Sequence, residues 1–397
     1  MVPQIFLNAK QAKHFDGRHP WVLERSVVEP TAAPQDGQVV ELMHPNGSWI
    51  GRGVYNSHSR IRVRLYQWDR ESTLDEAWLR EQLGAAVSMR RQQAERQHAS
   101  VDAMRLVNSE GDGLSGLVVD QFGDYLVIQF TSLAMYQQRD VVVGWLAEEL
   151  QPSGIQINVD KGTAKQEGLE AEVDWVHGTC PTEPLSIDEN GIRLEMDLAS
   201  GQKTGYYLDQ RANRQEAAKW MQPGSLLDIC CYHGGFSLAA SQSGNLSTVT
   251  AVDSSQRALE HAERNVANNG FENFAFEKAD CFDYLKQVAE ERKQFDNVVL
   301  DPPRMAGGRG PIQSALRAYH RLNLSAVNVL RPGGTLVTCS CSGRVYRDEF
   351  WGVLSSVAKR TRRRIQVVRS LAADFDHPID VNCPESDYLK CLICKVY

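Results

Sequence analysis

The chain has 397 residues, more than one typical hydrophobic core accommodates, so two or three domains are expected. Its hydrophobic content of 42% and charged content of 23% are typical of a soluble globular protein, and no apolar run of about eighteen residues could span a membrane. The formal net charge of −7 disfavours nucleic-acid binding through the overall field, although a local basic surface would suffice for phosphate contacts.

The cysteines point to a reducing compartment. The nine cysteines show no framework spacing, and the first residues lack the apolar core of a secretory signal, so we expect a cytoplasmic protein with reduced thiols. Cys391 and Cys394 form a CxxC pair, but no second ligand pair lies nearby and the surrounding segment is typical of a terminal strand. We therefore predict no metal site.

The N-terminal segment is predicted to be a small β-rich domain. The dipeptide Asn46-Gly47 between two apolar stretches indicates a hairpin turn. The segment that follows alternates strictly, so its apolar residues would face a core while three arginines face outward together: Arg60, Arg62 and Arg64. These arginines form either a solvated strand face or a basic stripe that tracks a phosphate backbone.

The middle of the chain is predicted to be a small α+β unit. A polar helix is expected from about Ser72 to Ala99, followed by two strands within residues 104–130 around turns at 111–116 and 123–124. A helix over about 135–150 and a strand over 155–160 complete the unit. It carries no recognisable chemistry of its own.

From about Glu189 onward, strands alternate with helices, which is the pattern of a doubly wound parallel sheet. Strands are predicted at residues 225–231, 247–253, 295–301 and 334–340. Such sheets bind ligands at the carboxyl ends of their strands. The basic run at 359–364 lies at the end of a predicted helix. It is either a solvated helix end, where cations favour the helix dipole, or an RNA contact.

Two of these strand ends predict an adenosine ligand. The first strand ends at Asp228 and a tight turn through Tyr232 and Gly234 leads into a helix, which lets the backbone approach a ligand closely. The next strand ends in Asp253, where a carboxylate can accept both hydrogen bonds from a ribose diol. The alternative role for Asp253 is a helix cap.

A third strand end places Asp280 and Cys281 where contacts to the adenine edge are expected. Asp280 could equally be a plain helix N-cap, and Cys281 a small buried filler.

The sequence DPPR at residues 301–304 indicates the class of reaction. Two prolines fix a rigid, extended backbone after the strand. In methyltransferases that modify nucleobases, an acidic or amide residue before a double proline commonly holds the base, which is the role predicted for Asp301. Enzymes that methylate exocyclic amines usually carry an aromatic residue after the prolines. Arg304 stands there, so amine methylation is disfavoured.

Two cysteines end the next strand, Cys339 and Cys341. A thiolate beside a methyl donor can add to C6 of a pyrimidine, which makes C5 nucleophilic enough to take the methyl group. Two buried cysteines in a core strand would be the structural alternative. The chemistry alone fits cytosine and uracil equally.

Five segments together resemble the bacterial 23S ribosomal RNA cytosine-5 methyltransferase family: GQKTGYYLDQR (201–211), CYHGGF (231–236), VDSSQRALEHAERNV (252–266), LDPPR (300–304) and SCSG (340–343). RHPWV (18–22), GDGLSGLVVDQFGDYLV (111–127) and the segment at 376–396 also resemble parts of that family. The likeness therefore covers nearly the whole chain.

The resemblance implies an α/β protein of three parts. These are a PUA-like RNA-binding domain over residues 1–72, a central α+β domain over 73–185, and a Rossmann-like methyltransferase domain over 186–397 with a mostly parallel seven-stranded sheet. It further implies S-adenosylmethionine (SAM) as cofactor and 23S ribosomal RNA as partner, with a homodimer as a further possibility.

The resemblance also assigns roles by position. Cys341 matches the family's nucleophile and Asp301 the residue that orients the cytosine. The positions that match cofactor contacts are Tyr207, Gln210, Arg211, Asp228, Tyr232, Gly234, Asp253, Asp280 and Cys281. Strand periodicity places Cys339 on the same side as Cys341, so the choice between them rests on the motif. A uracil or another RNA as target, and a non-catalytic RNA-binding factor, are the alternatives.

Overall fold

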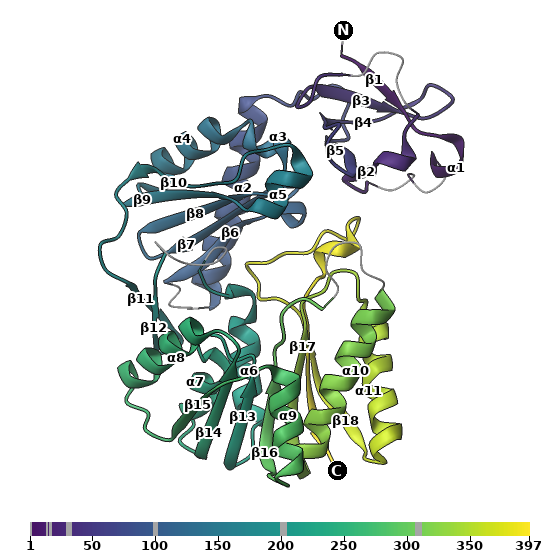
Figure 1. The fold of residues 1–397 in the computed structure, drawn as a ribbon. Coiled ribbons are helices and arrows are strands. Elements are labelled where there is room, and N and C mark those ends of the chain that lie inside the picture. The colour runs from purple at the N-terminus through teal and green to yellow at the C-terminus, as the bar shows by residue number, and fades with distance from the viewer. Residues whose placement is uncertain are drawn as a thin grey trace. The chain divides into compact units, whose positions relative to one another are not determined.

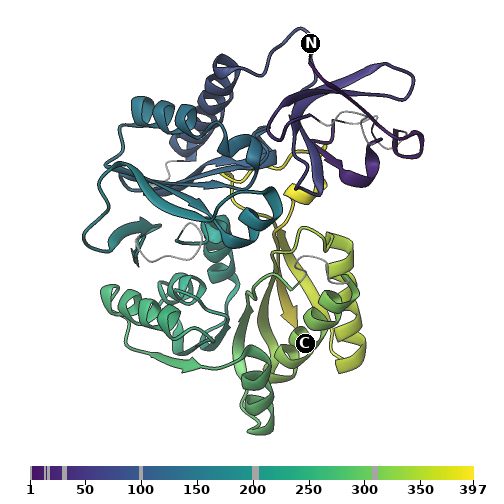
Figure 2. The same cartoon turned by 45° about the horizontal axis from the view of Figure 1, so that its top comes forward.

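The computed structural model describes residues 2–12, 15, 18–28, 34–97, 102–198, 205–305 and 312–397 (Figure 1). The chain forms two compact units. Unit 1 comprises Met1–Ile187, Met196–Tyr206 and Phe375–Ser386, and unit 2 comprises Asp188–Glu195, Tyr207–Asp374 and Asp387–Tyr397. Two short segments of the C-terminal half thus belong to unit 1, and the second of them can be followed in yellow in Figure 2.

The first part of unit 1 is a five-stranded sheet of order β1-β3-β4-β5-β2, with the short helix α1 (Ala9–Ala12) and the 3-10 turn η1 (Glu24–Ser26). Its strands are β1 (Gln4–Phe6), β2 (Trp21–Leu23), β3 (Val39–Met43), β4 (Trp49–Tyr55) and β5 (Ile61–Gln67). The predicted hairpin at Asn46-Gly47 is confirmed, because it joins the antiparallel strands β3 and β4, and Gly47 adopts the positive φ that the turn requires.

The prediction that Arg60, Arg62 and Arg64 face outward together is wrong for Arg62 and Arg64, which are each only 8% exposed. The second face of β5 is covered by other parts of unit 1. The Arg64 guanidinium donates to Ser115 Oγ at 2.9 Å and pairs with Glu167 at 3.2 Å. Arg62 donates to backbone carbonyls beside its own strand. A continuous basic stripe for phosphate binding is therefore not present, and only Arg60 of the three is exposed.

The second part of unit 1 is a sheet of order β10-β9-β8-β7-β6. Its strands are β6 (Ala103–Asn108), β7 (Leu117–Phe122), β8 (Tyr125–Phe130), β9 (Gly154–Val159) and β10 (Glu172–Gly178), and its helical segments are α2 (Glu76–Gln97), η2 (Ser109–Asp112), α3 (Leu133–Tyr136), α4 (Arg139–Leu150) and α5 (Lys161–Glu167). Residues 104–130 hold three strands and not the predicted two, because the turns at 111–116 and 123–124 each separate a pair of strands.

Unit 2 is built on a seven-stranded sheet of order β15-β14-β13-β16-β17-β19-β18, preceded by the two-stranded pair β11 (Leu185–Glu189) and β12 (Ile192–Met196). The sheet's strands are β13 (Gly224–Ile229), β14 (Leu246–Asp253), β15 (Phe274–Lys278), β16 (Phe295–Leu300), β17 (Leu330–Ser340), β18 (Ile365–Leu371) and β19 (Lys390–Val396). The pairings are parallel except those of β19, which runs antiparallel to both neighbours. The predicted doubly wound, mostly parallel sheet is confirmed.

Helices connect the strands of this sheet: α6 (Arg211–Trp220), α7 (Gly235–Ser241), α8 (Gln256–Asn268), α9 (Cys281–Glu290), α10 (Ile312–Val329) and α11 (Arg347–Thr361), with 3-10 turns η3 (Leu208–Gln210) and η4 (Pro384–Ser386). Alternate residues of the strands fill two apolar clusters. Leu227 packs with residues of α10 and α11, while Leu226 packs with residues of α6 and α7. Cys394 belongs to the first cluster and Cys391 to the second, so the CxxC thiols lie on opposite faces.

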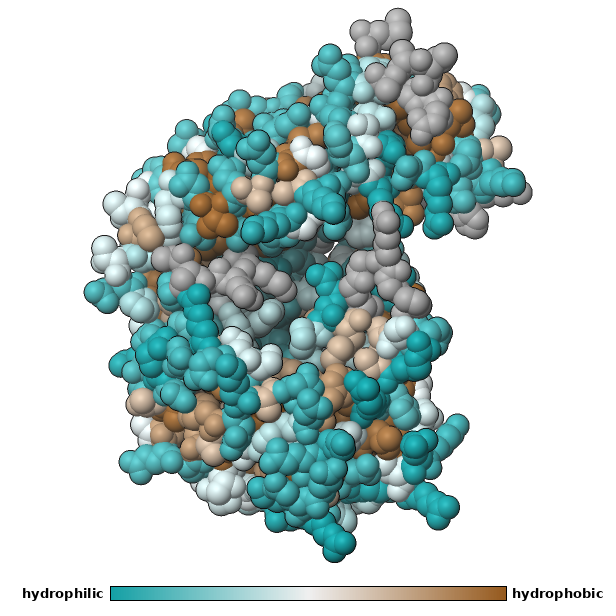
Figure 3. Space-filling view, viewed as in Figure 1, coloured by the Kyte–Doolittle hydropathy of each residue, from teal (hydrophilic) through white to brown (hydrophobic). Residues whose placement is uncertain are grey.

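The surface shows no large apolar area in the view of Figure 3, where hydrophobic residues lie in small groups between hydrophilic ones. Among the residues that the structure describes, no helix combines the length and hydrophobicity needed to cross a bilayer.

Candidate functional site

The loop between β13 and α7 is a tight turn built around a buried acid. Asp228 is 1% exposed, and its Oδ2 accepts a hydrogen bond from Ser237 Oγ at 2.6 Å. Its other oxygen has no hydrogen-bond partner among the described residues. Burial raises the pKa of Asp228 to about 6. A buried carboxylate oxygen without a partner is costly unless a ligand supplies the donor.

The backbone of this loop is strained where a ligand would approach it. Gly234 has a φ of 80°, and Cys230 and Tyr232 have φ values of 62° and 51°, which side chains rarely adopt. Asp253, at the end of β14, holds the strained turn in place, because its Oδ2 accepts the Tyr232 N–H at 3.0 Å. Its Oδ1 accepts the Ser255 N–H at 2.9 Å.

Asp253 is not the cap of α8, since Ser255 occupies that position and accepts from the Ala258 N–H. A carboxylate offers about four acceptor positions, so Asp253 retains capacity for a ribose diol beside these two bonds.

Asp280 does cap a helix, as the alternative interpretation expected. Its Oδ1 accepts the N–H groups of Phe282 and Asp283 at the start of α9. Cys281 is half-buried and its thiol forms a hydrogen bond with that of Cys230. Their contacts with a cofactor stay a prediction.

The ends of the adjacent parallel strands β16 and β17 bring the two reactive groups together. Asp301 follows β16 and Cys341 follows β17, and the Cys341 thiol lies 3.8 Å from the carbonyl oxygen of Pro302. Cys341 is half-buried. Cys339 is fully buried opposite Cys391 in the sheet, which raises the pKa of its thiol. Because β17 ends at Ser340, strand periodicity does not extend to Cys341 and the two cysteines have different surroundings.

Asp301 is set up to hold a proton near neutral pH. Burial, followed by the charges of Asp209 and Asp228, raises the pKa of Asp301 to about 7. Gln210 Nε2 donates to Asp301 Oδ1 at 3.0 Å, so the predicted segment at 207–211 reaches the reactive groups.

The rest of that segment divides in role. Tyr207 is 42% exposed and lies edge to face against Tyr232, with ring centroids 5.0 Å apart. Arg211 is buried and forms an ion pair with Asp374 at 2.7 Å, which indicates a structural contribution in addition to its predicted cofactor contact. Residues 201–204 of the motif lie outside the described residues.

Two residues that the sequence did not single out hold the loop of Cys341. Lys390 Nζ donates to Ser342 O at 2.7 Å and to Tyr388 O at 2.9 Å. The Tyr319 hydroxyl lies 3.2 Å from Ser342 Oγ. Burial lowers the pKa of Lys390 to about 8. A lysine that begins an otherwise apolar strand was the one signal in the sequence that could have identified Lys390.

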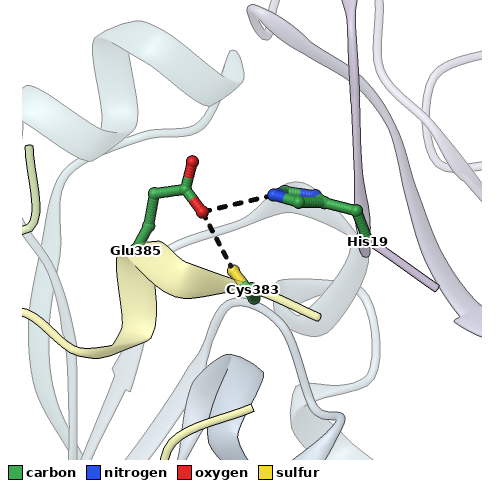
Figure 4. A group of neighbouring side chains, drawn as sticks. All are labelled: His19, Cys383 and Glu385. Carbon is green, nitrogen blue, oxygen red and sulfur yellow. Dashed lines mark hydrogen bonds and ion pairs between the residues drawn. The ribbon is translucent and has the colours of Figure 1, made fainter. Parts of the chain in front are cut away.

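A separate group in unit 1 has the residue types of a metal site: His19, Cys383 and Glu385 (Figure 4). His19 Nε2 lies 3.2 Å from Glu385 Oε2, and the Cys383 thiol lies 3.7 Å from the same oxygen. However, His19 Nδ1 accepts the backbone N–H of Trp21, so the proton of the neutral ring is on Nε2. That nitrogen donates to Glu385 and lacks the free lone pair that a metal requires. These contacts join segment 375–386 to the first sheet.

Comparison with known proteins agrees with this geometry. A family described as S-adenosylmethionine-dependent methyltransferase matches residues 164–382, and a PUA-like domain matches residues 5–68. The crystal structure of a protein described as a methyltransferase, with S-adenosylhomocysteine bound, shares the fold over 100% of both chains, with a TM-score of 0.84 and 20% sequence identity. The fold and the site define the chain as a SAM-dependent methyltransferase.

Closer relatives specify the family. The protein named ribosomal RNA large subunit methyltransferase I from Shewanella amazonensis is 36% identical over 99% of both chains. Its counterpart from Shewanella denitrificans is 35% identical over 100% of both. The chain belongs to the ribosomal RNA large subunit methyltransferase I family.

The residues at the strand ends fit SAM as the cofactor. Asp228 offers an unpaired buried oxygen to a donor, and Asp253 offers acceptor capacity to the ribose. The acidic surroundings suit a ligand that carries positive charge.

Proposed function

We propose that the chain methylates C5 of a cytosine in 23S ribosomal RNA through a covalent bond between Cys341 and C6 of the base. The observation that carries this proposal is the position of the Cys341 thiol, 3.8 Å from the carbonyl oxygen of Pro302, the residue after Asp301. The relatives named as large subunit ribosomal RNA methyltransferases support the RNA target.

In this proposal Cys341 acts as a thiolate that forms a sulfur–carbon bond at C6 and leaves C5 nucleophilic. SAM, when bound, supplies the electrophilic methyl group. After C5 loses its proton, the bond between Cys341 and C6 breaks and the thiolate returns. Asp301 holds the polar edge of the base, and a proton held on its carboxyl group can offset the charge that builds on the ring.

The PUA-like domain is proposed to bind the RNA outside the target base, by shape and by phosphate contacts. The target base must leave its stack to reach Cys341. Arg60, which is exposed just before β5, is the remaining candidate of the three predicted arginines for a phosphate contact.

The decisive experiment replaces Cys341 with Ala. Methyl transfer to 23S ribosomal RNA should be lost, while SAM affinity measured by calorimetry stays unchanged. The matched control is Cys339→Ala, which removes the neighbouring buried thiol and should retain activity. RNA that carries 5-fluorocytidine should form a stable covalent complex with the wild-type protein and none with Cys341→Ala.

Normal turnover by Cys341→Ala would refute the covalent role. Mass analysis of nucleosides from the methylated RNA would identify the base, and 5-methyluridine as the product would refute cytosine. A protein that binds RNA but no SAM would be a non-catalytic binding factor.

A further inference from the structure

Lys390 is a buried lysine at the carboxyl end of β17, close to the loop that carries Cys341. It is 1% exposed, begins the antiparallel strand β19, and stands opposite Ser340 in the ladder. Its ammonium group donates to the carbonyl oxygen of Ser342, the residue after Cys341, and to that of Tyr388. The hydrogen bond to Ser342 O places a positive charge beside the residue that follows Cys341.

Burying an ammonium group is costly unless charges or hydrogen bonds compensate. Two carboxylates face Lys390, and each is already engaged. Asp387 forms an ion pair with Arg347 at 3.1 Å, and Glu349 accepts the Tyr346 N–H at the start of α11. The described hydrogen-bond partners of Lys390 are neutral carbonyls, so these bonds leave its positive charge able to act on neighbouring groups.

The surroundings of Cys341 require such a cation. Asp301, which follows β16, opposes a negative sulfur when it is ionised. Tyr207, just before η3, and Tyr319 of α10 bring hydroxyl groups. A thiolate in this setting needs nearby positive charge to form at neutral pH. Lys390 brings that charge from β19.

We propose that Lys390 is a positioning residue for methyl transfer: its ammonium group stabilises the thiolate of Cys341, and its bond to Ser342 O holds the loop of Cys341 beside Pro302. The proposal rests on the nucleophilic role of Cys341 proposed above. The ammonium group acts on the sulfur through its charge, which the hydrogen bond to Ser342 O holds beside the loop of Cys341.

The test replaces Lys390 with Met, which has a similar length and no charge. The matched control is Lys395→Met. Lys395 lies on the same strand and its ammonium also donates to a backbone carbonyl, that of Trp220, but it stands opposite Thr335 in the middle of β17, away from Cys341. The primary measurement is the rate at which iodoacetamide alkylates Cys341 as a function of pH, read by peptide mass analysis.

In Lys390→Met the pH at which Cys341 is half-reactive should rise by at least about one, so the alkylation rate near pH 7 falls roughly tenfold or more. Its kcat should fall with little change in the KM for RNA, and raising the pH should restore part of the lost activity. Lys395→Met should match the wild type in both assays. If Lys390 had only a structural role, raising the pH would not restore the activity lost in Lys390→Met.

An unchanged pH dependence of alkylation in Lys390→Met would overturn the proposal even if activity fell. Should that variant fail to fold, the wild-type protein still provides a test: Cys341 must titrate below about 8.5, the value of a free cysteine, and a higher value overturns the proposal. These readouts do not depend on methyl transfer. Activity retained by Cys341→Ala would refute the nucleophile while leaving the effect of Lys390 on the thiol intact.

Discussion

Replacing Asp301 with Asn should stabilise unit 2 while impairing methyl transfer. The fold raises the pKa of Asp301 from its ordinary value of 3.8 to about 7, chiefly through burial. The folded protein therefore holds this proton more tightly than the unfolded chain does. For an acid with a raised pKa, stability that is present below the unfolded pKa is lost as the pH rises through the folded pKa.

The size of the effect follows from the two pKa values. A difference of one between them corresponds to about 1.4 kcal/mol, so the gap between 3.8 and about 7 corresponds to about 4 kcal/mol above pH 7. An asparagine at position 301 cannot ionise, and its side-chain oxygen still accepts from Gln210. The advantage of Asp301→Asn should therefore grow by about 2–3 kcal/mol between about pH 5 and pH 8.

Calorimetry can measure this gain in the full chain. The transition of unit 2 is the one that added SAM moves to higher temperature, because a ligand stabilises the unit that binds it. For a unit of this size the pH-dependent gain corresponds to roughly 5–10 °C. Methyl transfer to RNA by the same variant should fall, because the proton on Asp301 is lost.

The control is Asp296→Asn on the same strand, β16. Burial alone would raise the pKa of Asp296, but hydrogen bonds from Ser225 and the ion pair with Arg331 hold that pKa below its ordinary value. This variant should lose stability by an amount that stays constant between about pH 5 and pH 8, because the wild-type carboxylate is ionised throughout. If the difference in the stability of unit 2 between the wild type and Asp301→Asn does not change with pH, the reasoning is refuted.

Two further changes test contacts outside the reactive groups. Arg64→Met leaves Glu167 buried without its cation and should lower the free energy of unfolding of unit 1 by about 3–5 kcal/mol. Urea unfolding followed by tryptophan fluorescence measures this loss, and a loss under about 1 kcal/mol would contradict the buried pair. Arg363→Ala removes donors to the carbonyls of Val327 and Leu330 and should destabilise unit 2 by about 1–3 kcal/mol. The control is Arg362→Ala, which replaces an exposed neighbour and should change stability by less than about 1 kcal/mol.

The sequence located most of the candidate site because parallel strands end at one edge of their sheet. Asp228 and Asp253 lie at the ends of strands, and Asp301 and Cys341 directly follow strands. These strands alternate or run apolar, so local patterns sufficed to place the four residues. The structure distinguishes Cys341 from Cys339, since the strand ends between them.

The misplaced residues depend on contacts that no local pattern encodes. Alternation in β5 correctly predicted one buried face. On the second face, Arg64 contacts Ser115, in the turn before β7, and Glu167, at the end of α5. Arg363, in the basic run interpreted as a solvated helix end, turns back onto carbonyls of α10 and β17. In both cases distant segments of the chain supply the partners of a charged residue.

The electrostatics of the site pose two opposed demands. Asp228, Asp253 and Asp301 gather negative charge at the ends of β13, β14 and β16, which favours a positively charged cofactor but disfavours a thiolate. A parallel sheet alone would place Cys341 at the same acidic edge. Strand β19 runs antiparallel to its neighbour β17, so it begins where β17 ends. Its first residue, Lys390, therefore places a cation at that edge. In the proposed mechanism, β19 thus supplies the positive charge that a nucleophilic sulfur needs beside the acids proposed to hold the methyl donor.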